Sequence, residues 1–101
     1  MSLAELYTRA VGVLISELER SIAETKDTAR AARRVSLSES DTVEMLARMV
    51  PEWEDRIAEL RRISARVLRD DDTIEMEEFL CGARESGAPG FAFLAGWEPQ
   101  D

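Results

Sequence analysis

Histidine is absent from this chain of 101 residues, and cysteine and lysine each occur once. Without histidine, the chain lacks the commonest general base and the commonest metal-ligating side chain. The single cysteine, Cys81, cannot form a disulfide within the chain, which is typical of a reducing compartment. The single lysine, Lys26, lies in a basic stretch without the apolar surroundings that activate an amine. These shortages predict a non-catalytic protein that needs no cofactor.

Long hydrophobic runs are absent as well. The longest run of apolar or glycine residues is Gly90–Trp97, which is far shorter than the about 20 residues that a membrane-spanning helix needs. The first residues show no cationic stretch followed by an apolar one, which a signal peptide would have. Acidic residues outnumber basic ones, giving a net charge of −8 and a pI near 4.6, which opposes binding to phosphate backbones. We therefore expect a cytoplasmic protein that contacts neither a membrane nor nucleic acid directly.

Proline and glycine are scarce over the first two thirds of the chain, and the apolar residues there follow helical spacing. Residues 3–34 contain no proline and one glycine, and their apolar residues recur every three or four positions. Residues 41–69 keep an apolar heptad on both sides of Pro51, which favours one continuous, kinked helix. Because a short polar stretch joins the two segments, we expect a long antiparallel helical hairpin.

A third helix is predicted over 72–86. Asp72 and Glu75 have the spacing of an N-terminal capping box, and Gly87 is a typical C-cap residue. The remaining residues place prolines and glycines between apolar side chains, so we expect an extended aromatic tail over 87–101. The predicted fold is all-α, with one helical domain over 1–86 followed by this tail, and it is expected to pair into a multi-helix bundle.

The first predicted helix carries more apolar surface than one neighbouring helix can cover. Its N-terminal half has two adjacent apolar stripes, and an exposed second stripe would form a large apolar patch. Either the third helix and the tail fold back over this stripe, or a second copy of the chain covers it. We favour a homo-oligomer, with a dimer preferred, that forms through Leu3, Leu6, Tyr7, Val11, Leu14 and Leu18.

Basic residues are nearly missing from the last third of the chain. Residues 70–101 hold one basic residue, Arg84, against nine acidic ones, and they include four of the six aromatic residues. Helix capping and core closure would explain some of these side chains, but not the shortage of basic ones. We therefore predict that the acidic third binds a protein partner with a basic surface through Glu75, Glu77, Glu78, Phe79, Phe91, Phe93 and Trp97.

The leading functional prediction is a non-catalytic protein–protein interaction module, an adaptor or assembly factor that self-associates and binds this basic partner. The alternative is a small acidic inhibitor, such as an immunity protein, an antitoxin or an anti-defence protein. Such an inhibitor would block the cationic site of a nucleic-acid enzyme with its acidic surface. The two differ in their effect on a target, because only the inhibitor displaces nucleic acid from it.

Carboxylates at helical spacing suggest a second alternative. Glu52, Asp55 and Glu59 would share one helix face, and Glu75 and Glu78 would lie one turn apart. These residues resemble the Glu-x-x-Glu and Glu-x-x-Asp pairs of all-helical nucleotide pyrophosphohydrolases, and the resemblance implies a Mg²⁺-dependent hydrolase. The plainer interpretation is a solvated helix face with local Glu–Arg pairs.

One short motif precedes the second predicted helix. Arg33, Arg34 and Ser36 are spaced as basophilic protein kinases require, and a phosphate on Ser36 would meet both arginines. A helix that ends in cations and is followed by a polar loop explains the same residues.

Overall fold

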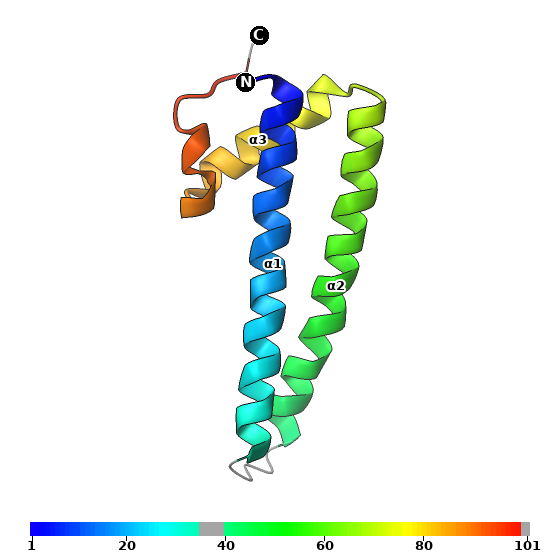
Figure 1. Ribbon diagram of the computed structural model, residues 1–101, viewed down its shortest axis with the longest axis vertical. Coiled ribbons are helices and arrows are strands. Elements are labelled where there is room, and N and C mark those ends of the chain that lie inside the picture. The colour runs from blue at the N-terminus through cyan, green and yellow to red at the C-terminus, as the bar shows by residue number, and fades with distance from the viewer. Residues whose placement is uncertain (35–39, 100–101) are drawn as a thin grey trace. The chain divides into compact units, whose positions relative to one another are not determined.

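The computed structural model describes residues 1–34 and 40–99, without the side chains of residues 32–34, 40–43 and 46. These residues form the helices α1 (Leu3–Arg34), α2 (Ser40–Arg69) and α3 (Thr73–Ser86) and the 3₁₀ helix η1 (Pro89–Leu94), as Figure 1 shows. The described part contains no strand, so the all-α prediction is confirmed. The α-helix bounds agree with the predicted ones to within one residue. Ser36 lies outside the described residues.

The chain divides into two compact units. Unit 1 combines Met1–Ile15 with Leu60–Asp101, and unit 2 consists of Ser16–Glu59. Each unit therefore contains one part of α1 and one part of α2. The predicted boundary between a helical domain over 1–86 and a separate tail differs from this division, because the tail belongs to the same unit as the first residues of the chain.

The helix α2 continues through Pro51, as the unbroken apolar heptad predicts. A proline inside a helix has no N–H to donate to the carbonyl four residues earlier, here that of Ala47. Tertiary packing must therefore outweigh the local loss, and Ile57 and Val67 from the heptad are both buried. None of the described helices is long and apolar enough to cross a membrane.

The core of unit 1 forms where α3 lies across the N-terminal half of α1 (Figure 1). One cluster of buried side chains joins α1, α3 and η1 and contains Ala10, Leu80, Ala83, Phe91 and Leu94. A second cluster joins α1, α2 and α3 and contains Tyr7, Val11, Val67 and Met76. The half-buried Phe79 packs against both clusters, and its ring meets that of Tyr7 edge to face at 5.4 Å.

The segment after α3 is not extended, which corrects the prediction for the tail. Pro89 begins η1 with the backbone angle that suits a first helical position. Phe91 and Leu94 are three residues apart, so a 3₁₀ helix places both on one side, and both are buried. Apolar burial of this pair selects the helical form, and the turn continues with a hydrogen bond from the Trp97 N–H to the Leu94 carbonyl at 3.0 Å.

Candidate functional site

The aromatic side chains of the last third lie within unit 1, and they differ in what covers them. Phe91 is 8% exposed and belongs to the core, so little of its ring is accessible to a partner. Phe93 is half-buried, with the guanidinium carbon of Arg9 4.2 Å from its ring centre. Trp97 is half-buried as well, and the guanidinium carbon of Arg84 lies 5.8 Å from its ring centre. Two arginines of the same unit therefore face these rings.

Arg84 holds the end of the chain in a second way. Its Nη1 donates a hydrogen bond to the Trp97 carbonyl, 13 residues further along. Sequence reasoning missed the roles of Arg9 and Arg84. The signal for Arg84 was its position as the single basic residue of the acidic third, whereas nothing in the sequence points to Arg9.

The predicted oligomerisation residues lie in both units. Tyr7 and Val11 are buried in the core of unit 1, where α2 and α3 cover them. Leu3, Leu6 and Leu14 are half-buried in the same unit, and they pack against the cluster that includes η1. Leu18 is half-buried in unit 2. The chain itself therefore covers much of the second apolar stripe of α1, which is the intramolecular arrangement considered above.

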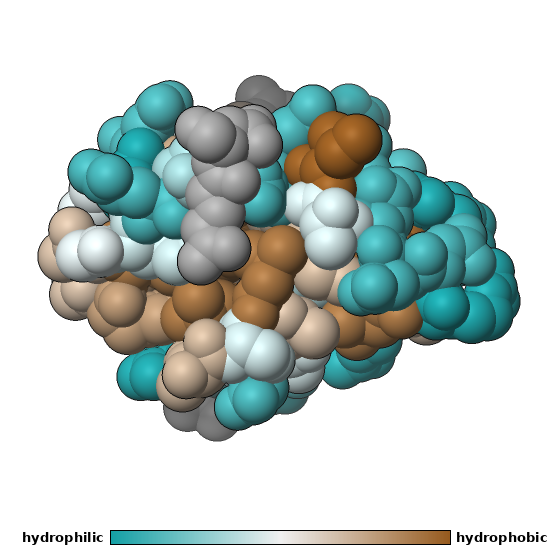
Figure 2. All heavy atoms as spheres, turned by 90° about the horizontal axis from the view of Figure 1, so that it is seen from above, coloured by the Kyte–Doolittle hydropathy of each residue, from teal (hydrophilic) through white to brown (hydrophobic). Residues whose placement is uncertain are grey.

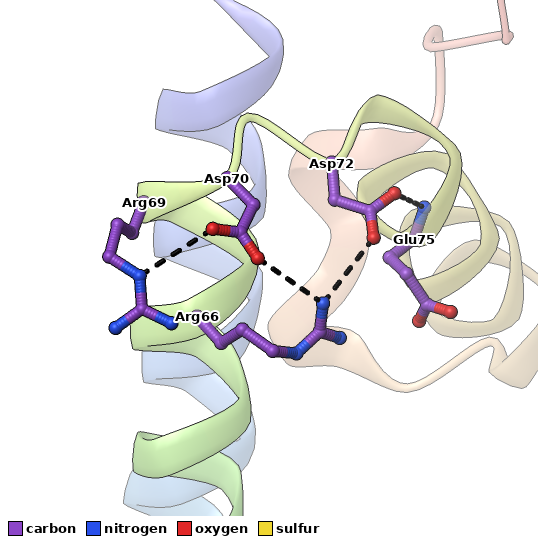
Figure 3. A network of polar contacts seen from close by, with 5 residues as sticks. All are labelled: Arg66, Arg69, Asp70, Asp72 and Glu75. Atoms are coloured by element: carbon purple, nitrogen blue, oxygen red, sulfur yellow. Dashed lines mark hydrogen bonds and ion pairs between the residues drawn. The ribbon is translucent and has the colours of Figure 1, made fainter.

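The acidic segment is less isolated in space than it is along the chain. Unit 1 contains six basic and ten acidic side chains and unit 2 contains seven and eleven, so each unit carries a net charge of −4. Figure 3 shows Arg66 beside the carboxylates of Asp70 and Asp72, at 3.9 and 3.5 Å, while Arg69 pairs with Asp70 at 3.5 Å. Arginines at the end of α2 thus face the first acids of the acidic third.

Asp72 also caps α3. Its Oδ1 accepts a hydrogen bond from the Glu75 N–H at 3.2 Å, which is one of the two hydrogen bonds of a capping box. The Asp72 N–H donates to the Val67 carbonyl at 3.0 Å instead of to Glu75. The αL backbone of Gly87, with φ of 70°, ends the same helix as predicted. Burial raises the pKa of the Tyr7 hydroxyl, the negative charge of Glu75 raises it further, and Arg66 partly opposes the shift. Asp72 and Gly87 thus define the two ends of α3.

Besides Glu5 on α1, five glutamates of unit 1 have no described basic side chain within ion-pairing distance. They are Glu75, Glu77, Glu78, Glu85 and Glu98. The first four lie on α3, and Glu98 follows Trp97 directly. An uncompensated negative charge of this kind attracts cationic groups.

Two grooves of unit 1 bring some of these glutamates next to apolar side chains. Groove A has a volume of about 290 Å³ and is lined by Met1, Ser2, Leu3, Leu6, Glu77, Trp97 and Glu98. It therefore joins the first residues of α1 to the end of the chain, with two carboxylates beside an apolar surface. Figure 2 shows the molecule from above, and on this face apolar residues form a band between hydrophilic ones.

Groove B is also about 290 Å³ in volume and is more apolar. Its lining residues are Leu14, Glu78, Phe79, Gly82, Ala83 and Phe91. A Cβ atom built on Gly82 would meet nothing within 4 Å, so the glycine leaves the groove open. Groove A and groove B together contain five of the predicted partner-binding residues, Glu77, Glu78, Phe79, Phe91 and Trp97.

Unit 2 has a groove of opposite character, here called groove C. It is about 290 Å³ in volume and is lined by Thr25, Lys26, Ala29, Arg30, Ala47, Val50 and Pro51. Small and apolar side chains form most of it, and its charged residues are both cations. Arg30 is paired only weakly, at 3.5 Å from the carboxylate of Asp27, and both side chains are exposed.

Among the side chains that the structure describes, no three from acidic residues or cysteine lie close enough together to hold a metal ion. Glu52, Asp55 and Glu59 belong to unit 2, whereas Glu75 and Glu78 belong to unit 1. The resemblance to nucleotide pyrophosphohydrolases stays an untested prediction.

No protein-family model, curated protein or solved structure matches this chain.

Proposed function

We propose that this protein is a non-catalytic interaction module that self-associates and binds a basic, partly apolar segment of another protein at groove A. The observation that supports the proposal is the presence of Glu77 and Glu98, both without a described basic partner, beside Leu3, Leu6 and Trp97. In this proposal α3 supplies one carboxylate and the end of the chain supplies the other.

A lysine or arginine side chain matches groove A because it has a positively charged head and an apolar stem. The charged head would pair with Glu77 or Glu98, while the aliphatic stem would cover Leu3 or Leu6. Trp97 adds a large apolar surface of the kind that often dominates binding energy. The remaining α3 glutamates would accelerate the encounter through long-range attraction without needing to touch the partner.

This proposal refines the sequence prediction rather than repeating it. The predicted anchors included Phe91 and Phe93, but one is a core residue and the other lies under Arg9. Trp97 keeps its predicted role because it lines groove A together with Glu77. Leu3 and Leu6, which were predicted to join two copies, are here assigned to the partner.

A fluorescence titration tests the proposal in the full chain. Replacing Trp53 by phenylalanine leaves Trp97 as the single tryptophan, so its emission reports on groove A. The probe is a short peptide of alternating arginine and leucine. We expect the peptide to change the emission of Trp97, and we expect its binding to weaken as salt is added.

Paired variants locate the binding. Glu77→Gln with Glu98→Gln should lower the affinity for the peptide by about 2- to 30-fold, the range expected for loss of two ionic contacts near the surface. Glu52→Gln with Glu54→Gln removes the same charge from exposed positions of unit 2 and should leave the affinity close to that of the parent. Equal losses in both variants, or equal binding of a glutamine–leucine peptide, would contradict recognition at groove A.

The inhibitor alternative differs in a single measurement. Once a basic partner is identified, an adaptor should leave its nucleic-acid binding intact, whereas an inhibitor should compete with nucleic acid for it. A competition assay with a labelled oligonucleotide separates the two functions.

A further inference from the structure

Groove C and the start of α3 have complementary chemistry. Groove C offers a shallow apolar surface beside the cations Lys26 and Arg30, and its volume is about 290 Å³. Cavities of about 150 Å³ already admit a benzene molecule, so groove C has room for one branched apolar side chain. A carboxylate next to such a side chain could pair with the cations.

The start of α3 exposes a side chain of this kind. Ile74 is 70% exposed although it lies on a helix that buries Met76, Leu80 and Ala83. Residues three and four positions further along a helix share a face, so Glu77 and Glu78 lie on the same side as Ile74. The fold of unit 1 leaves most of Ile74 exposed, and its neighbours along the chain are acidic.

We propose that groove C of one copy receives Ile74 and the adjacent Glu78 of a second copy. The isoleucine would cover Ala29, Ala47 and Val50, while Glu78 would face Lys26 and Arg30. Each chain then carries both a donor surface, on α3, and an acceptor surface, in unit 2. Contacts between two different surfaces can close into a ring or continue into a chain of copies.

The inference rests on the self-association part of the proposed function and replaces its predicted surface. Tyr7 and Val11 from the predicted oligomerisation stripe are buried within their own chain, whereas Ile74 and groove C are accessible. Neither Ile74 nor Glu78 lines groove A, so substituting them tests self-association without removing a residue of that groove.

Sedimentation equilibrium over a range of protein concentrations, at low and high salt, tests the proposed contact. We expect the full chain to associate and the association to weaken as salt is added. Three variants should each weaken the association by about tenfold or more. They are the single substitutions Ile74→Ser and Glu78→Lys and the double substitution of Lys26→Glu with Arg30→Glu. The double substitution of Arg61→Glu with Arg62→Glu changes the net charge as much as the double substitution in groove C does. Because both positions are exposed and lie outside the two surfaces, it should leave the association unchanged.

Mixing two defective variants gives the sharpest result. The chain with Glu78→Lys presents a basic donor, and the chain with Lys26→Glu and Arg30→Glu presents an acidic acceptor. Each variant alone repels itself, but an equimolar mixture should associate because the charges match again. Helical circular dichroism of each variant excludes unfolding as the cause of a loss.

The possible results separate the two proposals. If the unaltered chain stays monomeric at every concentration, both self-association and this contact are refuted, and groove C is left for an acidic segment of another protein. If the variants associate as well as the parent does, self-association stands and this contact is refuted. If the mixture fails to associate although the parent does, the proposed pairing of Glu78 with Lys26 and Arg30 is wrong.

Discussion

Unit 1 and unit 2 each contain one part of α1 and one part of α2, but they bury very different numbers of side chains. In unit 1, nine apolar side chains are buried in two clusters that join α1, α2, α3 and η1. Among the described side chains of unit 2, only Thr25 and Ile57 are buried. The difference shows that the third helix and η1, rather than the hairpin alone, create a core. A pair of helices has one shared interface, so the local free energy of unfolding should be lower in unit 2.

The largest expected effect concerns Phe91, which the sequence predicts to bind a partner and which the structure places in the core. Phe91→Ala should lower the free energy of unfolding by about 3–5 kcal/mol, because it leaves a cavity between α1, α3 and η1. Phe93→Ala is the matched control, since Phe93 is on the same 3₁₀ helix but is half-buried under Arg9. Urea denaturation of both variants measures the difference. Similar losses at the two positions would contradict the assignment of Phe91 to the core.

The second effect compares the same substitution in the two units. Leu80 is fully buried in unit 1, so Leu80→Ala should lower the free energy of unfolding by about 2–5 kcal/mol. Leu18 is half-buried in unit 2, so Leu18→Ala should cost less than about 2 kcal/mol. Urea denaturation monitored by helical circular dichroism provides both values. A larger loss at Leu18 would show that unit 2 is packed more tightly than its described side chains indicate.

Sequence patterns predicted the helices because helices depend on local information. The spacing of apolar residues predicted α1 and α2. The side chain of Asp72 and the backbone freedom of Gly87 predicted where α3 begins and where it ends. The 3₁₀ helix could not be predicted in the same way. Phe91 and Leu94 become helical because a surface made by Ala10, Leu80 and other residues distant in sequence is there to bury them.

The candidate site was predicted residue by residue but not as an arrangement. Glu77 and Trp97 were predicted to bind a partner and Leu3 and Leu6 to join two copies, whereas the structure places all four in groove A. A local pattern does not show that the two ends of a chain meet. The charge pattern was misleading for the same reason, since the arginines of α2 that balance Asp70 and Asp72 fall just outside the acidic third.

The third effect concerns the arginine that holds the end of unit 1. Arg84→Met keeps an unbranched apolar stem but removes the hydrogen bond to the Trp97 carbonyl and the charge near the ring. We expect a loss of about 1–2 kcal/mol in the free energy of unfolding, and a Trp97 that is more accessible to a soluble fluorescence quencher. Quenching is measured with Trp53 replaced by phenylalanine. Arg62→Met, at an exposed position of the same unit, should change neither quantity.

The fourth effect compares alanine substitution at two glycines of unit 1, where the change in stability should have opposite signs. Gly87 has a φ of 70°, which costs a residue with a side chain about 1 kcal/mol, so Gly87→Ala should destabilise the protein by about that amount. Gly12 lies inside α1 with open space around it, so Gly12→Ala should stabilise the protein by about 0.5–1 kcal/mol. Thermal unfolding of both variants measures the two shifts. Equal signs would contradict either the left-handed C-cap of α3 or the open helical position in α1.

The smallest effect is a dependence of the stability of unit 1 on pH. Burial and the negative charges of Glu75 and Asp72 raise the pKa of Tyr7 above its ordinary value of about 10, and the positive charge of Arg66 partly opposes this shift. The folded chain therefore holds the tyrosine proton more tightly than the unfolded chain does. The resulting stabilisation is complete below the unfolded pKa and is lost as the pH rises through the folded pKa. Tyr7→Phe keeps the ring that meets Phe79 but removes the proton, so the decline in stability at alkaline pH should be shallower in this variant. Since Tyr7 is the single tyrosine, the near-ultraviolet absorbance of tyrosinate reports its titration directly, and an ordinary pKa in the folded chain would show that the hydroxyl is not influenced by the core of unit 1.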